Sequence, residues 1–266
     1  MLSLKNKIVF ITGASSGIGE ACAKQFAALG ARLILTARRI DRIQKLASTL
    51  KNEHKIEVLP LKLDVQNKEE VAKVIRELPK DWQAIDVLVN NAGLALASDK
   101  IQDGKIENWE VMVNTNVLGL LYVTHAILPE MIKRNYGHII NIGSIAGHDY
   151  YVGGNVYCAT KHAVKAINKS MRLDLSGSDI RITEISPGLT HTEFSEVRWK
   201  SKERSDQFYS GLTPLSADDI ADTIVYAATR PVHVNIEEMT IFPTAQASTN
   251  IVYKKGQAPT TKGVFE

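Results

Sequence analysis

Short apolar runs alternate with amphipathic helical stretches along nearly the whole chain, and this alternation limits the possible folds more than any other feature. The runs have the length and the Val, Ile and Leu content of buried strands. They lie at Ile8–Ile11, Leu33–Leu35, Glu57–Leu61, Val87–Val89, His138–Ile142, Arg181–Ile185 and Glu238–Ile241. Strands that are apolar on both faces are typical of a parallel sheet with helices on both sides. The right-handed crossover rule therefore predicts an α/β fold, a doubly wound parallel sheet with three layers, in a single domain over residues 1–266.

Composition makes several classes of protein improbable. Of the 266 residues, 44% are hydrophobic and 23% are charged, which is the range of ordinary globular domains. A net charge of +3 without a long Lys/Arg block gives little support for nucleic-acid or membrane binding. No apolar run approaches the roughly 18 residues of a membrane helix, so we expect no span.

Cysteine usage and the start of the chain favour a cytoplasmic protein. The two cysteines, Cys22 and Cys158, lie outside any CxxC or Cys/His cluster, which predicts no disulfide framework and no metal site. Cys158 is expected to be a small buried side chain. The first strand begins within about ten residues of the start, which leaves no room for a secretory leader.

A glycine-rich turn follows the first strand and predicts a dinucleotide site. Thr12–Gly19 has the spacing GxxxGxG and leads into a helical pattern. Gly13 allows a tight turn, Gly17 lets backbone approach a pyrophosphate, and Gly19 lets the helix pack closely, while the helix N-terminus offers amide donors. The alternative is a structural βα turn without a ligand.

Two arginines at the end of the second strand favour NADP over NAD. An NAD site often has an acid at this position, whereas Arg38 and Arg39 suit the 2′-phosphate of NADP through charge-assisted hydrogen bonds. The alternative is a solvated, cationic start of a helix. Asp64 and Val65 follow the third strand, where the carboxylate is expected either to meet the adenine amino group or to cap a helix.

A tyrosine and a lysine four residues apart predict hydride-transfer chemistry. Reduction of a carbonyl requires a proton donor for the substrate oxygen, and Lys161, one helical turn from Tyr157, is expected to lower the pKa of the phenol. Ser144 follows the fifth strand, where its hydroxyl can hold the substrate oxygen.

Four motifs in order resemble the short-chain dehydrogenase/reductase family in its core form. They are Thr12–Gly19, Asn90-Asn91-Ala92-Gly93, Tyr157-Cys158-Ala159-Thr160-Lys161 and Pro187-Gly188. The resemblance implies a Rossmann fold, a catalytic set of Asn116, Ser144, Tyr157 and Lys161, and a water held by Asn116, although Asn114 is close by. Its cofactor residues would be Gly13, Ser15, Ser16, Gly17, Ile18, Gly19, Arg38, Arg39, Asp64, Val65, Asn91, Ala92, Gly93, Tyr157, Lys161, Pro187, Gly188, Thr190 and Thr192.

Further segments are similar to the NADP-dependent 3-hydroxy acid and serine dehydrogenase subgroup. They are Asn141–Gly147, Gly188–Ser195 with Val197-Arg198, and Thr240–Thr244. The subgroup implies reversible hydride transfer between NADP(H) and a small polar 3-hydroxy acid, serine, allo-threonine or a semialdehyde. The alternatives are a 3-ketoacyl or xenobiotic carbonyl reductase, for which Tyr150, Tyr151 and Arg198 suggest too polar a pocket, and a non-catalytic dinucleotide-binding protein.

Two less core-like segments complete the expectations. Residues 193–211 are a candidate substrate lid, in which Arg198 would bind a substrate carboxylate or sulfonate beside Ser144, unless the segment is a mobile loop. His148 and His191 are candidates to line the pocket. Helical stretches near Trp109–Met131 and Tyr157–Leu175 and the tail, residues 246–266, would by resemblance form the contacts of a homotetramer.

Overall fold

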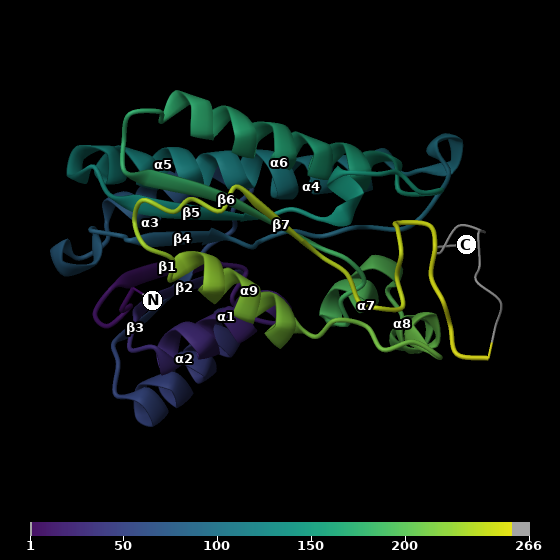
Figure 1. Cartoon of the computed structure of the whole chain (residues 1–266), viewed down its shortest axis with the longest axis horizontal. Coiled ribbons are helices and arrows are strands. Elements are labelled where there is room, and N and C mark those ends of the chain that lie inside the picture. Colours follow the sequence, from purple (N-terminus) through teal and green to yellow (C-terminus); the bar gives the residue numbers. More distant parts are fainter. Residues whose placement is uncertain (1, 257–266) are drawn as a thin grey trace.

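The computed structural model describes residues 2–256 and consists of seven parallel strands with helices on both faces (Figure 1). The strands are β1 (Ile8–Thr12), β2 (Arg32–Ala37), β3 (Val58–Lys62), β4 (Val87–Asn90), β5 (Gly137–Ile142), β6 (Ile180–Pro187) and β7 (Glu238–Ile241). The α-helices are α1 (Gly17–Ala28), α2 (Ile40–His54), α3 (Lys68–Arg76), α4 (Ile106–Val113), α5 (Leu120–Arg134), α6 (Asn155–Asp174), α7 (Glu193–Trp199), α8 (Lys202–Tyr209) and α9 (Ala217–Ala228). The short helices are η1 (Lys80–Trp82), η2 (Ile101–Asp103), η3 (Asn114–Gly119) and η4 (Ile145–Gly147).

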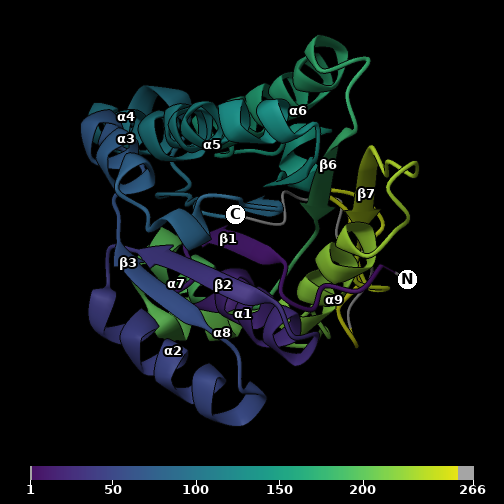
Figure 2. The same ribbon diagram turned by 90° about the vertical axis from the view of Figure 1, so that its left-hand side faces the viewer.

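The strand order creates a crevice at one edge of the sheet. The order is β3-β2-β1-β4-β5-β6-β7, so the chain winds outward from β1 in one direction and from β4 in the other. Helices α1, α2 and α9 cover one face, and α3 to α6 cover the other (Figure 2). Loops that leave β1 and β4 run to opposite faces, which opens a space at the carboxyl ends of these strands. The predicted doubly wound, three-layer fold is confirmed.

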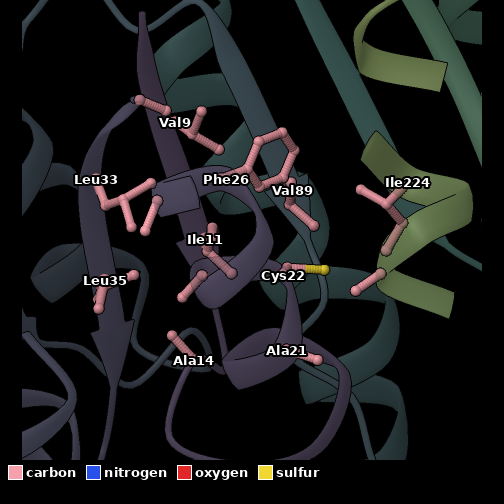
Figure 3. Close-up of a cluster of buried hydrophobic side chains, with 14 of the residues drawn as sticks. Val9, Ile11, Ala14, Ala21, Cys22, Phe26, Leu33, Leu35, Val89 and Ile224 are labelled. Atoms are coloured by element: carbon pink, nitrogen blue, oxygen red, sulfur yellow. The ribbon is translucent and has the colours of Figure 1, made fainter. Parts of the chain in front are cut away.

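The core follows the two-residue period of the strands. In β1, Val9 and Ile11 point toward α1 and α9, where they pack with Phe26 and Ile224 (Figure 3). Phe10 points the other way, into a second cluster under α3 and α5. Each buried side chain of this size contributes about 1.5–3 kcal/mol through its removal from water. Both faces of β1 are therefore fixed, which holds the turn that follows this strand.

The expected helix near Trp109–Met131 is longer and contains a π-helical segment. Helix α4 continues through η3, whose hydrogen bonds have the wider π spacing, into α5. The combined helix, Ile106–Arg134, is long and apolar enough to cross a membrane, and it is the one such helix within residues 2–256. The expectation that no stretch reaches this length was therefore wrong. Nearly half of its most apolar window, 44%, is buried inside the molecule, as in core helices of globular proteins.

The candidate lid is helical, and the tail returns to its own subunit. Helices α7 and α8 lie within residues 193–211 and stand together at one end of the molecule (Figure 1). Gln246 accepts a hydrogen bond from the backbone of Leu189 (2.8 Å), and Thr249 is buried. The first part of the expected contact arm therefore packs against the chain that follows β6. Residues 257–266 of the predicted tail lie outside the described residues.

Candidate functional site

A cavity of about 390 Å³ lies at the carboxyl ends of β1 to β6. It has the size of a small-ligand or cofactor site. The structure brings nearly all the predicted residues to its wall: Gly13, Ser15, Ser16, Gly17, Ile18, Arg38, Arg39, Asp64, Val65, Asn91, Ala92, Gly93, Ser144, Tyr157, Lys161, Pro187, Gly188, Thr190, Thr192 and Arg198. Gly19 and Asn116 lie behind the wall.

The glycine turn is held by close contacts that a side chain would block. Gly13 has a φ of +67°, in the left-handed region. A Cβ atom at Gly19 would lie 2.5 Å from the carbonyl oxygen of Gly13 and 2.6 Å from Nδ2 of Asn91. Asn91 in turn donates to the carbonyl oxygens of Thr12 (2.9 Å) and Gly13 (3.2 Å). The turn is therefore fixed from β4 and leaves the N-terminus of α1 open toward the cavity.

A cationic cluster stands at the end of the cavity beside the glycine turn. Arg39 donates to the hydroxyls of Ser15 (3.0 Å) and Ser16 (2.8 Å). It also forms an ion pair with Glu193 at 3.0 Å, and Arg42 reaches the same carboxylate at 2.7 Å. Arg42 and Glu193 were missed from the sequence, although Arg42 follows Arg39 by three residues and so shares its helix face.

Asp64 has no helix to cap. Its carboxylate accepts from the backbone of Gln66 (3.1 Å), whereas Asn67 is the N-cap of α3 and accepts from Glu70. Asp64 remains on the cavity wall, where the adenine contact stays a prediction.

Ser144, Tyr157 and Lys161 meet at the opposite end of the cavity. Tyr157 and Lys161 lie one turn apart on α6, with the Lys161 Nζ atom 5.9 Å from the centre of the tyrosine ring. Ser144 and Tyr157 both line the cavity, and the Ser144 hydroxyl lowers the pKa of the phenol. Lys161 donates to the carbonyl oxygen of Ile142 (2.8 Å) at the end of β5. All three side chains are buried, so charges placed among them are weakly screened.

Burial controls the protonation of this group. Removal from water raises the pKa of Tyr157 to about 12, and this exceeds the lowering by the Ser144 hydrogen bond and by the charge of Arg198. The expectation that a neighbouring lysine gives the phenol a lowered pKa was wrong, because burial has the larger effect. Tyr157 is therefore a neutral phenol at pH 7. Burial also lowers the pKa of Lys161 to about 8, although Glu184 raises it.

Asn116 lies within the π-helical segment and is fully engaged. It accepts from the backbone of Leu94 (2.9 Å), donates to the carbonyl oxygen of Leu94 (2.8 Å) and donates to Thr160 (3.1 Å). A Cβ at Gly93 would lie 3.4 Å from Oδ1 of Asn116 and 3.7 Å from Nζ of Lys161. Asn116 and Lys161 thus approach the same glycine, and the role with a water that the resemblance implies for Asn116 stays a prediction.

Arg198 is a buried cation on the lid side of the cavity. It is 5% exposed and lies 5.9 Å from the centre of the Tyr157 ring. Its guanidinium donates to Ser98 (3.1 Å) and to the hydroxyl of Tyr151 (3.1 Å). Burial of a guanidinium is unfavourable unless polar or charged groups compensate, and these contacts hold the group at the cavity wall.

Three other residues that the sequence suggests for the pocket do not line the cavity wall. Neither His148 nor His191 lines its wall. Tyr150 is 67% exposed and stacks on His162, whereas Tyr151 does line the wall. Helical and turn geometry decides which of two neighbouring tyrosines faces the cavity, and this is not visible in the order of residues.

A family model described as short chain dehydrogenase matches residues 7–203 of the chain. A curated relative from Schizosaccharomyces pombe, named NADP-dependent 3-hydroxy acid dehydrogenase, is 44% identical over 257 residues, which are 96% of this chain and 99% of the relative. Sulfoacetaldehyde reductase 2 from Chromohalobacter salexigens is 44% identical over 242 residues, 90% of this chain and 95% of the relative.

A solved structure extends the similarity to three dimensions. It is described as the closed form of serine dehydrogenase complexed with NADP+ and aligns with a TM-score of 0.87 at 40% identity. The alignment covers 93% of this chain and 99% of that chain. The similarity in sequence and in structure therefore extends over nearly the whole molecule.

Proposed function

Because the chain belongs to the short-chain dehydrogenase family, we propose that it is an NADP-dependent oxidoreductase that interconverts small anionic 3-hydroxy compounds and the corresponding carbonyl compounds. The observation that carries this proposal is one cavity with a cationic cluster at one end and a buried Ser144, Tyr157 and Lys161 at the other. Serine and semialdehydes belong to the same substrate class.

The residues present fit the dinucleotide. The glycine turn leaves backbone amides open toward the cavity, and Gly19 has no space for a side chain. Arg38 and Arg39, beside Ser15, would hold the 2′-phosphate, and Tyr157 and Lys161 would hold the nicotinamide ribose. When bound, the cofactor supplies the hydride for reduction or accepts it in oxidation.

The chain's own residues handle the proton. In reduction, the Tyr157 phenol transfers its proton to the carbonyl oxygen of the substrate, while the Ser144 hydroxyl donates a hydrogen bond to the same atom. Lys161, as an ammonium, stabilises the phenolate that remains. The raised pKa of Tyr157 keeps the proton in place until the substrate is bound.

Arg198 supports the assignment of an anionic substrate. It lies in the cavity wall near Tyr157, where its guanidinium can form a charge-assisted pair with a carboxylate or sulfonate. The relatives named above act, by their names, on a hydroxy acid and on a sulfonated aldehyde. Both compounds carry an anionic group a few bonds from the reacting carbon.

Replacement of Arg198 is expected to separate charged from uncharged substrates. Arg198→Gln keeps a polar side chain against Ser98 but removes the cation. We expect KM for a 3-hydroxy acid to rise about 10- to 100-fold, the loss of one charge-assisted interaction, and KM for an uncharged alcohol of equal length to change little. Steady-state kinetics on a panel of serine, 3-hydroxy acids, semialdehydes and simple ketones would measure both.

The exposed Lys200 on the same lid is the matched control, and Lys200→Gln should leave both values unchanged. Equal losses for the charged and the uncharged substrate would contradict the anchoring role of Arg198. A panel in which only long apolar ketones are turned over would contradict the proposed substrate class.

A homotetramer in the cytoplasm is the proposed setting. Helices α4 to α6 expose apolar side chains on the face away from the sheet, among them Ile106 and Leu121. Light scattering should give four times the chain mass, and Leu121→Glu should lower this mass, whereas Leu29→Glu, at the exposed residue that follows α1, should not. A monomer for the unaltered chain would overturn the tetramer.

The two cysteines are free and buried, which suits the reducing compartment proposed for the protein.

A further inference from the structure

A fully buried glutamate lies on the strand next to one edge of the sheet, and its charge acts on the catalytic lysine. Glu184 is on β6, beside β5, and is 0% exposed. One of its oxygens, Oε1, accepts from the Ser186 hydroxyl (2.8 Å). The other, Oε2, has no hydrogen-bond partner among the residues that the structure describes. Burial of a carboxyl is unfavourable unless a charge or hydrogen bonds compensate, so this position requires an explanation.

A directional chain of donors leads from the surface to Glu184. Lys165 has only protons to offer, so its contact with Nδ1 of His148 (2.6 Å) places the imidazole proton on Nε2. That nitrogen lies 3.2 Å from Oγ of Ser186 and 3.3 Å from Oε1 of Glu238, so its proton faces both, and Ser186 donates to Glu184. The donors therefore end on two neighbouring carboxyl groups, Glu184 and Glu238, and the hydrogen bond from Ser186 favours the ionised form of Glu184.

Gly143 gives the carboxyl its place next to the lysine. A Cβ at Gly143 would lie 2.1 Å from Oε1 of Glu184 and 2.8 Å from Oγ of Ser186. The residue before it, Ile142, provides the carbonyl oxygen that receives the Lys161 ammonium, and the residue after it is Ser144. Gly143, at the end of β5, therefore contacts the carboxyl group of Glu184, and its two chain neighbours are Ile142, which binds Lys161, and Ser144.

The charged groups around Glu184 come from three elements. Lys161 and Lys165 face it from α6, His148 from η4 at 4.0 Å, and Glu238 from the neighbouring strand β7. Burial raises the pKa of Glu184 and Glu238 adds to this effect, while Ser186, Lys161 and Lys165 oppose it. Glu184 in turn acts on Lys161: its charge raises the pKa of the lysine and so opposes the lowering by burial.

We propose that Glu184 is a positioning residue for the reaction: its buried carboxylate, held by Ser186 and His148, keeps Lys161 protonated beside Tyr157. The inference deepens the proposed function, since it concerns the lysine of the same site. It adds a counter-charge on β6 to the residues of α6 and β5. A carboxylate several ångströms from an ammonium in a weakly polar interior changes the pKa of the ammonium by about one unit.

The first test measures Lys161 directly, without cofactor or substrate. In protein labelled with [13C]lysine, the Cε resonance of Lys161 is assigned by its loss in Lys161→Arg and followed against pH. We expect a pKa near 8 in the unaltered protein and a value lower by about one unit in Glu184→Gln. Gln keeps the size of the side chain and its acceptor for Ser186. Glu184→Asp, which restores a charge, should recover part of the shift.

The second test follows the reaction. In the reductive direction, the ammonium form of Lys161 is the active form, so activity falls as pH rises through its pKa. A lower pKa in Glu184→Gln moves this alkaline limb of kcat to lower pH, with KM for NADPH unchanged. Glu238→Gln is the matched control, because Glu238 pairs with Glu184 in the sheet but is not a group that raises the pKa of Lys161, and it should move the limb much less.

Two results would overturn the inference. One is a Lys161 pKa in Glu184→Gln equal to that of the unaltered protein, which would mean that Glu184 is neutral or too distant. The other is an equal loss of kcat at all pH values, with no rescue by Asp, which would indicate a purely structural role. If the resonance shifts but no carbonyl compound is reduced, the charge coupling stands and the proposed activity is wrong.

Discussion

Tyr157→Phe is expected to abolish nearly all turnover, while the fold remains and the affinity for NADPH falls by much less than kcat. The change removes one oxygen atom, and the ring keeps its edge contact with Phe194 (5.8 Å between centroids). General acid catalysis by a positioned group contributes about 10²- to 10⁴-fold, and we expect kcat to fall by this factor. Consumption of NADPH in steady state measures the loss, and fluorescence titration measures NADPH binding.

Tyr151→Phe is the matched control, because it removes a second buried hydroxyl from the same cavity. That hydroxyl contacts Arg198, so its loss should raise KM more than it lowers kcat. If Tyr157→Phe reduced carbonyl substrates as fast as the unaltered enzyme, the proton would have to come from another donor. The proposed mechanism would then be wrong.

Arg39→Ala should change the choice of cofactor. The guanidinium is held by Ser15 and Ser16 at the end of the cavity where the 2′-phosphate of NADP would lie. Loss of a charge-assisted pair is expected to raise KM for NADP about 10- to 100-fold, with little change for NAD. The ratio of kcat/KM for the two cofactors, measured on one substrate, is the readout.

Lys45 provides the control, since it is an exposed cation on the same helix, α2, outside the cavity wall. Lys45→Ala should leave the ratio unchanged. Arg39 also pairs with Glu193 at the start of α7, so a disturbed lid would affect both cofactors alike. An equal loss for NADP and NAD would therefore assign Arg39 to the lid and not to the phosphate.

Residues whose role depends on local chain geometry were predicted well. Gly13 and Gly17 are required by a turn between a strand and a helix, and both have the positive φ values that such a turn needs. Tyr157 and Lys161 share a helix face because they are four residues apart. The strands were located because parallel strands covered on both faces are continuous apolar runs, and their ends differ from the prediction by at most two residues.

Residues whose role depends on contacts between distant segments were missed or misjudged. Glu193 meets Arg42 only because the lid folds back on α2, 151 residues earlier in the chain. Glu184 looks like an interruption in a strand, and its partners His148 and Glu238 come from two other elements. The pKa of Tyr157 was misjudged for a similar reason, since the extent of burial is a property of the whole packed site.

The bracing of the glycine turn by Asn91 also bears on how the protein acquires activity during synthesis. The side chain of Asn91 donates to Thr12 across 79 residues of sequence, and β1 pairs directly with β4. A nascent chain that has emerged only as far as β2 and β3 has the first three strands but lacks the fourth, on which the turn rests. The entropy cost of closing such a long loop arises before the contacts between β1 and β4 can stabilise the chain. Capture of a nucleotide therefore cannot assist the earliest steps of folding and instead reports that the central strands have already joined.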